Sequence, residues 1–300
     1  MEMTTKKKLT AGLSIGSNIL LTTLKIIAGI ISGSMSIISE AIHSMSDLLA
    51  SVLTYFSVVK SSQPADADHP YGHGKYEDMA GFIEGILILI ASIVIIFKSL
   101  EKIILGHPIE LENNIGIIVM GIAVIMNIIV SSLLFRVAKE SGSVSLYADG
   151  EHLRTDVYSS LGILIGLILI KITGYHVLDS IIAIFVGVFI FRAGHSIADE
   201  TLSRLLDHSL PAVDIEKIES VIDEFSDKVS LKPGSMKARQ VGPYKDIDLT
   251  LQFPKETSLC ECHQMCDEIK KRIQSIYESS SVSIHFEPLC YKNDCKNCQG

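Results

Sequence analysis

The stretch from Gly33 to Val59, GSMSIISEAIHSMSDLLASVLTYFSVV, combines a long apolar segment with ionisable side chains. It is long enough to cross a bilayer, which takes about 20 apolar residues. It nevertheless contains Glu40, His43 and Asp47. Steps of three and four residues place these side chains on one stripe of a helix. Because ionisable groups inside a membrane helix are costly unless they find a partner, the stripe predicts a shared partner, and a cation would satisfy all three.

The same acid–His–Asp spacing recurs in YADGEHLRTDVYSSLGILIGLILI, which begins at Tyr147 and contains Asp149, His152 and Asp156. If the two helices face each other, they offer two imidazole nitrogens and two carboxylate oxygens, a set that suits tetrahedral zinc. The two carboxylates would also neutralise a divalent ion. The alternative is that these residues form buried hydrogen bonds between helices. The metal site predicted between the two helices consists of His43, Asp47, His152 and Asp156.

The apolar segments all lie in the first two thirds of the 300-residue chain, so we predict an all-α membrane domain at residues 1–206. An even number of spans puts both termini on one side of the lipid bilayer. Lysine and arginine gather in the loops of that side, which makes it cytoplasmic. We therefore expect a multi-pass protein of the cell (inner) membrane with cytoplasmic termini. The six predicted spans are roughly 9–31, 35–59, 80–103, 115–136, 145–172 and 177–198.

The part after the last span is charged and predicts a small cytoplasmic α+β domain at residues 207–290. Its patterns give the order helix, strand, strand, helix, strand, which is typical of a two-layer sandwich. The core of such a domain is thin, so dimerisation is plausible. From residue 207 onward, about 12 basic residues stand against about 16 acidic ones, so a nucleic acid is an unsuitable partner.

The connection QPADADHPYGHGKYED, residues 63–78, is a second candidate metal site. It contains Asp66, His69 and His73, and two imidazoles with a carboxylate can bind a metal. The alternative is a solvated polar loop with a structural turn. The Gly74-Lys75 pair lacks the remaining residues of a phosphate-binding loop. ATP hydrolysis is therefore not indicated, and pumping would have to use an ion gradient.

Further candidate ligands lie in the cytoplasmic part. His263 falls on its second predicted helix, while His285 and Glu287 lie two residues apart on its last strand and share a face. All six cysteines are also in this part, and we expect them to be reduced thiols in the cytoplasm. Thiolates bind zinc and other soft metals, although small buried residues are the alternative. The cysteines considered as ligands are Cys260 and Cys262 and, in the tail of residues 291–300, Cys295 and Cys298.

Over nearly its full length the chain resembles the cation diffusion facilitator family of divalent-metal/proton antiporters. The resemblance rests on GSMSIISEAIHSMSD, QPADADHPYGHGKYE, ADGEHLRTDVYSSLG, LLDHSLP, ARQVGPYKDIDLTL and IHFEP. It implies a homodimer with six spans per protomer and a cytoplasmic domain of ferredoxin-like fold. It also implies that His43, Asp47, His152 and Asp156 form the transport site for the metal and that protons are the counter-ion.

The resemblance carries over two further sites, the loop site at Asp66, His69 and His73 and a regulatory site at His263, His285 and Glu287. Some relatives have another histidine before the ARQ segment, where this chain has Gly234-Ser235, so a binuclear regulatory centre requires a cysteine as substitute.

In the family, histidine at the first position of the pair in the second span accompanies zinc, which imidazole also favours on chemical grounds. His43 therefore favours zinc. Glu40 and Asp149 lie one turn away and could add oxygen ligands, so iron, cobalt, cadmium, nickel or manganese are alternative substrates.

We expect a transporter rather than an enzyme, with metal as substrate and regulatory ligand and no catalytic cofactor. An intramembrane metalloenzyme is disfavoured because the chain lacks an H-E-x-x-H motif and repeats its ligands symmetrically. A membrane-anchored metal sensor is the other alternative, and the cysteine-containing tail would suit it. A sensor, however, has no need of two ligand stripes inside the bilayer.

Overall fold

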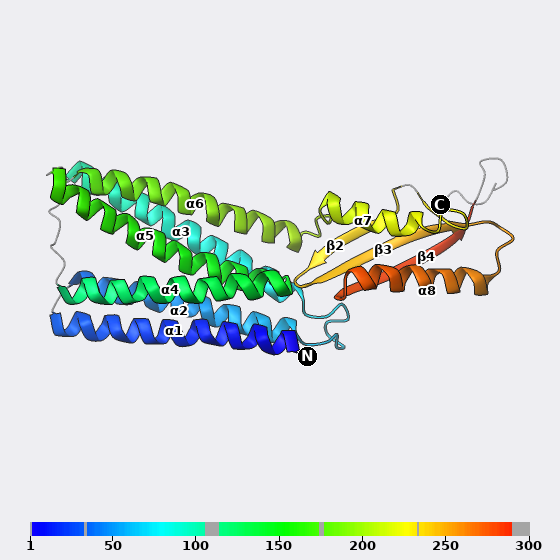
Figure 1. The fold of residues 1–300 in the computed structure, drawn as a ribbon, viewed down its shortest axis with the longest axis horizontal. Coiled ribbons are helices and arrows are strands. Elements are labelled where there is room, and N and C mark those ends of the chain that lie inside the picture. The colour runs from blue at the N-terminus through cyan, green and yellow to red at the C-terminus, as the bar shows by residue number, and fades with distance from the viewer. Residues whose placement is uncertain (1, 33–34, 106–113, 174–176, 233, 290–300) are drawn as a thin grey trace. The chain divides into compact units, whose positions relative to one another are not determined.

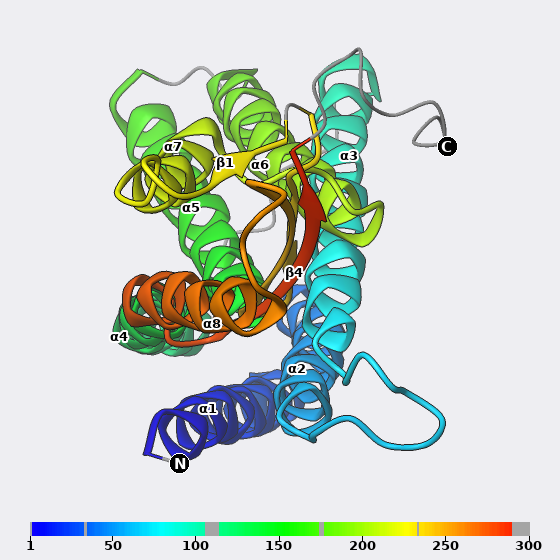
Figure 2. The same cartoon turned by 90° about the vertical axis from the view of Figure 1, so that its right-hand side faces the viewer.

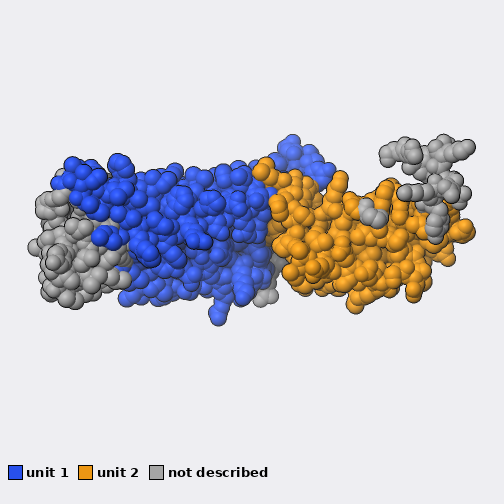
Figure 3. Space-filling model, turned by 90° about the horizontal axis from the view of Figure 1, so that it is seen from above, with its two compact units in different colours: residues 1–205 blue, residues 206–300 orange. Residues whose placement is uncertain are grey.

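The structure is a computed structural model that describes residues 2–32, 35–105, 114–173, 177–232 and 234–289. The chain divides into two compact units, unit 1 at Met1–Leu205 and unit 2 at Leu206–Gly300 (Figure 3).

Unit 1 consists of long helices that run alongside one another (Figure 1). Each predicted span falls almost entirely within one of these helices. Three segments among the described residues are long and apolar enough to cross a membrane, namely Met3–Ala28, Lys75–Leu105 and Gly121–Ser141. The helices are α1 (Glu2–Ser32), α2 (Met35–Ser61), α3 (Lys75–Leu105), α4 (Asn114–Ser141), α5 (Val144–Thr173) and α6 (Val177–Leu205).

Glycines allow the close packing of α3 against α6. A Cβ atom added to Gly85 of α3 would lie 2.8 Å from the backbone nitrogen of Ala198 on α6. A Cβ added to Gly194 of α6 would lie 2.9 Å from the side chain of Ile88. Side chains at both positions would push the helices apart, so these glycines have the packing role that small residues commonly have between membrane helices.

Unit 2 is an α+β layer structure in which both helices pack on one face of a small sheet (Figure 2). The elements are α7 (Ala212–Asp223), β1 (Ser230–Leu231), β2 (Lys237–Val241), β3 (Tyr244–Phe253), α8 (Leu259–Ile276) and β4 (Ser280–Pro288). Strand β3 pairs antiparallel with β2 and β1 and parallel with β4. The alternating residues Ile247, Leu249, Leu251 and Phe253 of β3 point into the core.

The observed order of unit 2 contains the predicted helix, strand, strand, helix, strand, and it adds the two-residue strand β1 before β2. The core between the helices and the sheet includes Ile218 and Ile222 of α7 and Ile269 and Ile273 of α8. The opposite face of β4 carries His285 and Glu287, so the candidate ligands of this strand lie outside the core.

Candidate metal sites

The first site lies between α2 and α5, where Asp47, His152 and Asp156 each place a ligand atom within 4.8 Å of the others. Asp47 and His152 are 5% and 7% exposed, and Asp156 is half-buried. The Nε2 atom of His152 is 3.1 Å from Oδ1 of Asp47. Two helices that are far apart in sequence thus bring two carboxylates and an imidazole together inside unit 1.

The chemistry of this cluster fits a divalent transition metal. Its two carboxylates supply oxygen ligands with the charge that a divalent ion neutralises, and imidazole nitrogen suits zinc and its neighbours. The Nδ1 atom of His152 is buried without a hydrogen-bond partner, which is a cost that ligand binding can relieve. Of the remaining predicted ligands, His43 and Glu40 lie on α2 with side chains outside the described part, and Asp149 lies on α5 outside this cluster.

The second site is the loop between α2 and α3, where Asp66, His69 and His73 also place ligand atoms within 4.8 Å of one another. The carboxylate oxygens of Asp66 are 3.4 Å from Nδ1 of His69 and 3.5 Å from Nε2 of His73. The ring of His73 is buried and neither of its nitrogens has a hydrogen-bond partner. Two imidazoles and a carboxylate in this arrangement match a zinc-type ligand set.

Local backbone geometry holds the loop site together. Oδ1 of Asp66 accepts hydrogen bonds from the backbone N–H groups of Asp68 and His69, which is the turn that aspartate side chains favour. The hydrogen bond from His69 holds the pKa of Asp66 below its usual value, so the carboxylate stays ionised. Gly72 has a φ of 83°, a conformation that glycine adopts without strain.

In unit 2 the predicted ligands are placed differently. His263 lies in the first turns of α8, exposed, with Nε2 at 3.6 Å from a carboxylate oxygen of Asp267. Glu287 accepts hydrogen bonds from Gln252 and Lys232, which hold its pKa below the usual value. His285 is exposed on β4. Among the described residues, no cluster of three potential ligands includes these side chains, so metal binding here stays a prediction.

The cysteines of α8 divide between surface and core. Cys262 and Cys266 are buried with the apolar side chains of unit 2, while Cys260 is exposed. Burial, with a contribution from Cys262, raises the pKa of Cys266 to about 11, so this thiol stays protonated. The placement of Cys262 and Cys266 favours the alternative that they are small buried residues. Cys295 and Cys298 lie outside the described residues.

The structure also contains buried lysine and glutamate side chains whose hydrogen-bonded contacts were not predicted from the sequence. Lys7 of α1 is 5% exposed and donates a hydrogen bond to the fully buried Glu77 at the start of α3. Glu77 also accepts hydrogen bonds from Ser61 of α2 and Ser143 next to α5. Lys25 of α1 is 8% exposed and donates to Ser44, which follows His43 in α2. The sequence signal for Lys25 was a lysine in the middle of an apolar span.

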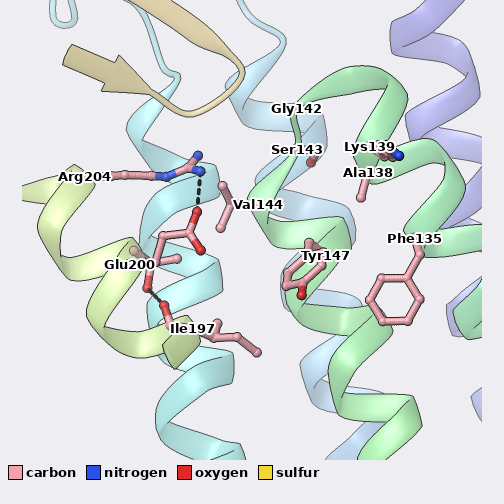
Figure 4. Close-up of a pocket in the computed structure, with 11 residues that line it drawn as sticks. Phe135, Ala138, Lys139, Gly142, Ser143, Val144, Tyr147, Ile197, Glu200 and Arg204 are labelled. Carbon is pink, nitrogen blue, oxygen red and sulfur yellow. Dashed lines mark hydrogen bonds and ion pairs between the residues drawn. The ribbon is translucent and has the colours of Figure 1, made fainter. Parts of the chain in front are cut away.

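A cavity of about 390 Å³ opens between the end of α4, the start of α5 and the last turns of α6 (Figure 4). Tyr147, Phe135 and Val144 line it, and Arg204 donates a 2.6 Å hydrogen bond to Glu200 at its edge. None of the predicted ligands lines this cavity, so it is separate from both metal-site candidates.

Comparison with known proteins agrees with this arrangement. The family model of the cation efflux transmembrane domain matches residues 12–206, and the model of the cation efflux protein cytoplasmic domain matches residues 210–289. The chain therefore belongs to the cation diffusion facilitator family and is a cation efflux transporter with a membrane domain and a cytoplasmic domain. This family is a class of transporters and not of enzymes, which agrees with the sequence-based expectation.

Its relatives span nearly the whole chain. The transporter sll1263 of Synechocystis sp. is 32% identical over 93% of this chain and 89% of its own. The transporter MJ0449 of Methanocaldococcus jannaschii is 32% identical over 92% of this chain and 96% of its own. The cation-efflux pump FieF of Shewanella oneidensis is 26% identical over 94% of each chain.

Proposed function

We propose that this protein exports a divalent transition-metal cation, with zinc as the main substrate, in exchange for protons. The observation that carries the proposal is the buried cluster of Asp47, His152 and Asp156 on α2 and α5. Ionisable residues inside a membrane domain commonly mark the path of an ion. The membership of a cation efflux family supports the same conclusion.

Zinc is the favoured substrate because the ligands include imidazole. With His43 as fourth ligand, the site would offer two nitrogens and two oxygens, and such mixed sites suit zinc. Cobalt, cadmium, nickel and iron accept similar ligands, whereas manganese prefers an all-oxygen set. Cobalt, cadmium, nickel, iron and manganese are therefore the alternative substrates of the same transporter.

Proton coupling follows from the ligands themselves. A metal and a proton compete for the same imidazole nitrogen and carboxylate oxygens, so metal binding releases protons and proton binding releases metal. In the inward-open state the site would take metal from the cytoplasm. After the helices rearrange, protons from the outside would displace the metal and return with the site. Export would then use the proton gradient.

We further propose the arrangement that the family resemblance implies. All six long helices of unit 1 would span the cell (inner) membrane, with both termini in the cytoplasm, and unit 2 would be a ferredoxin-like domain that joins two protomers as a homodimer. The match to the cytoplasmic domain of cation efflux proteins supports this arrangement. Metal bound at His263, His285 and Glu287 would tighten the dimer by neutralising acidic groups, so rising metal would increase export.

The test is metal uptake into proteoliposomes with zinc, cobalt, cadmium, iron and manganese, with and without a pH gradient. We expect zinc flux that follows the pH gradient and disappears in Asp156→Ala. If manganese or iron is transported in preference to zinc, the transport site has more oxygen ligands than proposed. If no metal is transported, the metal-sensor alternative replaces the proposal.

A further inference from the structure

Buried polar groups of unit 1 form a column that leads from one end of the helices to the cluster of Asp47, His152 and Asp156 (the transport cluster). Its α2 members, Asp47, Ser51, Thr54 and Ser61, recur at steps of three, four and seven residues and thus share one face. On α3, Glu77 and Glu84 are separated by seven residues, as are Thr54 and Ser61 on α2. Ser61 donates to Glu77 and Thr54 donates to Glu84, so the two helices are joined at two levels about 10 Å apart.

The two levels differ in how their acidic groups are neutralised. At the first level the fully buried Glu77 has a cationic partner, Lys7. At the second level, Glu84 of α3 and Asp149 of α5 are both fully buried and interact electrostatically with each other. His152 is a cationisable side chain that acts on both of them. His152 is already hydrogen-bonded to Asp47.

Each carboxylate of this second level has one oxygen that is held and one that is not. Oε1 of Glu84 accepts from Thr54, and Oδ1 of Asp149 accepts from Ser51. Asn18 of α1 in turn donates to Ser51 at 2.7 Å, which fixes that hydroxyl. Oε2 of Glu84 and Oδ2 of Asp149 are buried without any hydrogen-bond partner among the described residues. Buried acceptors of this kind are rare and costly unless a ligand satisfies them.

We propose that Glu84 and Asp149 form a second cation-binding site inside unit 1, which holds a divalent metal next to the transport cluster. Two carboxylates balance the charge of one divalent ion, and the hydroxyls of Ser51 and Thr54 orient them. The site differs from the transport cluster in having oxygen ligands only, which suit harder ions such as Mn²⁺ and hold zinc less tightly than imidazole does.

Weak binding is suited to a site on a transport path. A conducting pathway needs binding that is favourable enough for entry and weak enough for release. Asp149 lies three residues before His152 on α5, and Ser51 lies four residues after Asp47 on α2, so the second site is one helical turn from the transport cluster. The inference that this ion is in transit rests on the proposed transport function. The inference that the ion binds at this site is independent of that function.

The experiment counts bound Mn²⁺ by electron paramagnetic resonance on the full chain in lipid nanodiscs. The background variant is Asp156→Ala, so that the transport cluster is impaired throughout. In this background we expect Glu84→Gln and Asp149→Asn each to bind one Mn²⁺ fewer per protomer. The matched control is Glu101→Gln, which alters an exposed acid of the same helix and leaves the count unchanged. Glutamine retains the hydrogen bond from Thr54, so Glu84→Gln preserves the packing of α2 against α3.

Equal Mn²⁺ counts in Glu84→Gln, Asp149→Asn and the control would overturn the proposal. A changed pH dependence of transport with an unchanged count would instead identify the pair as a proton-binding site. Metal uptake by the wild-type protein separates this inference from the proposed function. If the wild-type protein takes up metal but all variants bind equal numbers of Mn²⁺ ions, only the second site is refuted. If Glu84→Gln and Asp149→Asn bind one Mn²⁺ fewer but the wild-type protein takes up no metal, the second site stands and transport is refuted.

Discussion

Unit 1 buries ionisable side chains such as Lys7, Glu77 and Asp149, whereas the described core of unit 2 consists of apolar residues and cysteines. All polar side chains that are buried in the described part of the chain lie in unit 1. Burying such groups is costly unless other groups satisfy them. The cluster of Asp47, His152 and Asp156 in unit 1 is therefore held between two helices, while His263 and His285 of unit 2 are exposed.

The largest effect should come from a pair of histidine substitutions, one in each unit. His152→Ala removes the buried imidazole of the transport cluster, and we expect metal uptake into proteoliposomes to fall by more than about 100-fold. The loss should be this large because removal of a residue that only hydrogen-bonds to a metal ligand already costs about 10- to 100-fold. His285→Ala removes an exposed imidazole of β4, and its effect on uptake should be at most a few-fold. Equal losses in the two variants would contradict the difference between the units.

A smaller effect is expected from the buried ion pair at the end of unit 1. Lys7→Met leaves Glu77 buried without its cationic partner, which should lower the free energy of unfolding by about 3–5 kcal/mol. The neighbouring Lys6 is exposed and pairs with the exposed Glu140, so Lys6→Met should cost at most about 1 kcal/mol. Denaturant titration of the reconstituted protein measures both.

A double substitution sharpens this test. Adding Glu77→Gln to Lys7→Met removes the uncompensated charge, so most of the lost stability should return. If the double variant is as unstable as Lys7→Met, the role of Lys7 is packing and not neutralisation.

Local patterns were sufficient to predict most elements of the fold. The second helix predicted for the cytoplasmic part corresponds to α8 at Leu259–Ile276, and a capping box of Ser258 and Glu261 begins this helix. Alternation along β3 likewise matches one buried face. The strand β1 has two residues and pairs with Leu251 and Gln252, so it leaves no periodic pattern to detect.

Partners that are distant in sequence could not be predicted from the residue pattern. Lys7 counts as a positive charge flanking the first span, yet it is buried against an acid that is 70 residues away. In the sequence, Glu84 is a lone acid near the start of a predicted span, where its side chain could equally reach the polar membrane interface. Its burial beside Asp149 depends on the packing of α2, α3 and α5. Repeated spacing on α2 and α5 was the one long-range signal that the sequence itself contained.

The smallest expected effect tests the polar contacts of unit 2. Although burial opposes ionisation, hydrogen bonds from Lys245 at 2.5 Å and Tyr277 at 2.9 Å hold the pKa of Asp214 below its usual value. Burial and Asp214 raise the pKa of Tyr277 to about 12, so its hydroxyl remains a donor. Tyr277→Phe should therefore destabilise α8 by about 1 kcal/mol at pH 7. Hydrogen exchange of the α8 amides in the full chain measures this change.

The dependence of this effect on pH distinguishes a charge-assisted hydrogen bond from a contribution that is independent of charge. Because the pKa of Asp214 is lowered by folding, its contribution to stability is present above about pH 4, the usual aspartate pKa, and is lost as the pH falls through the lower folded-state value. The difference between wild type and Tyr277→Phe should then narrow below about pH 4. Tyr244→Phe, at an exposed tyrosine, should show no difference at either pH. A Tyr277→Phe difference that stays constant across this range would mean that the hydroxyl of Tyr277 contributes to stability independently of the charge on Asp214.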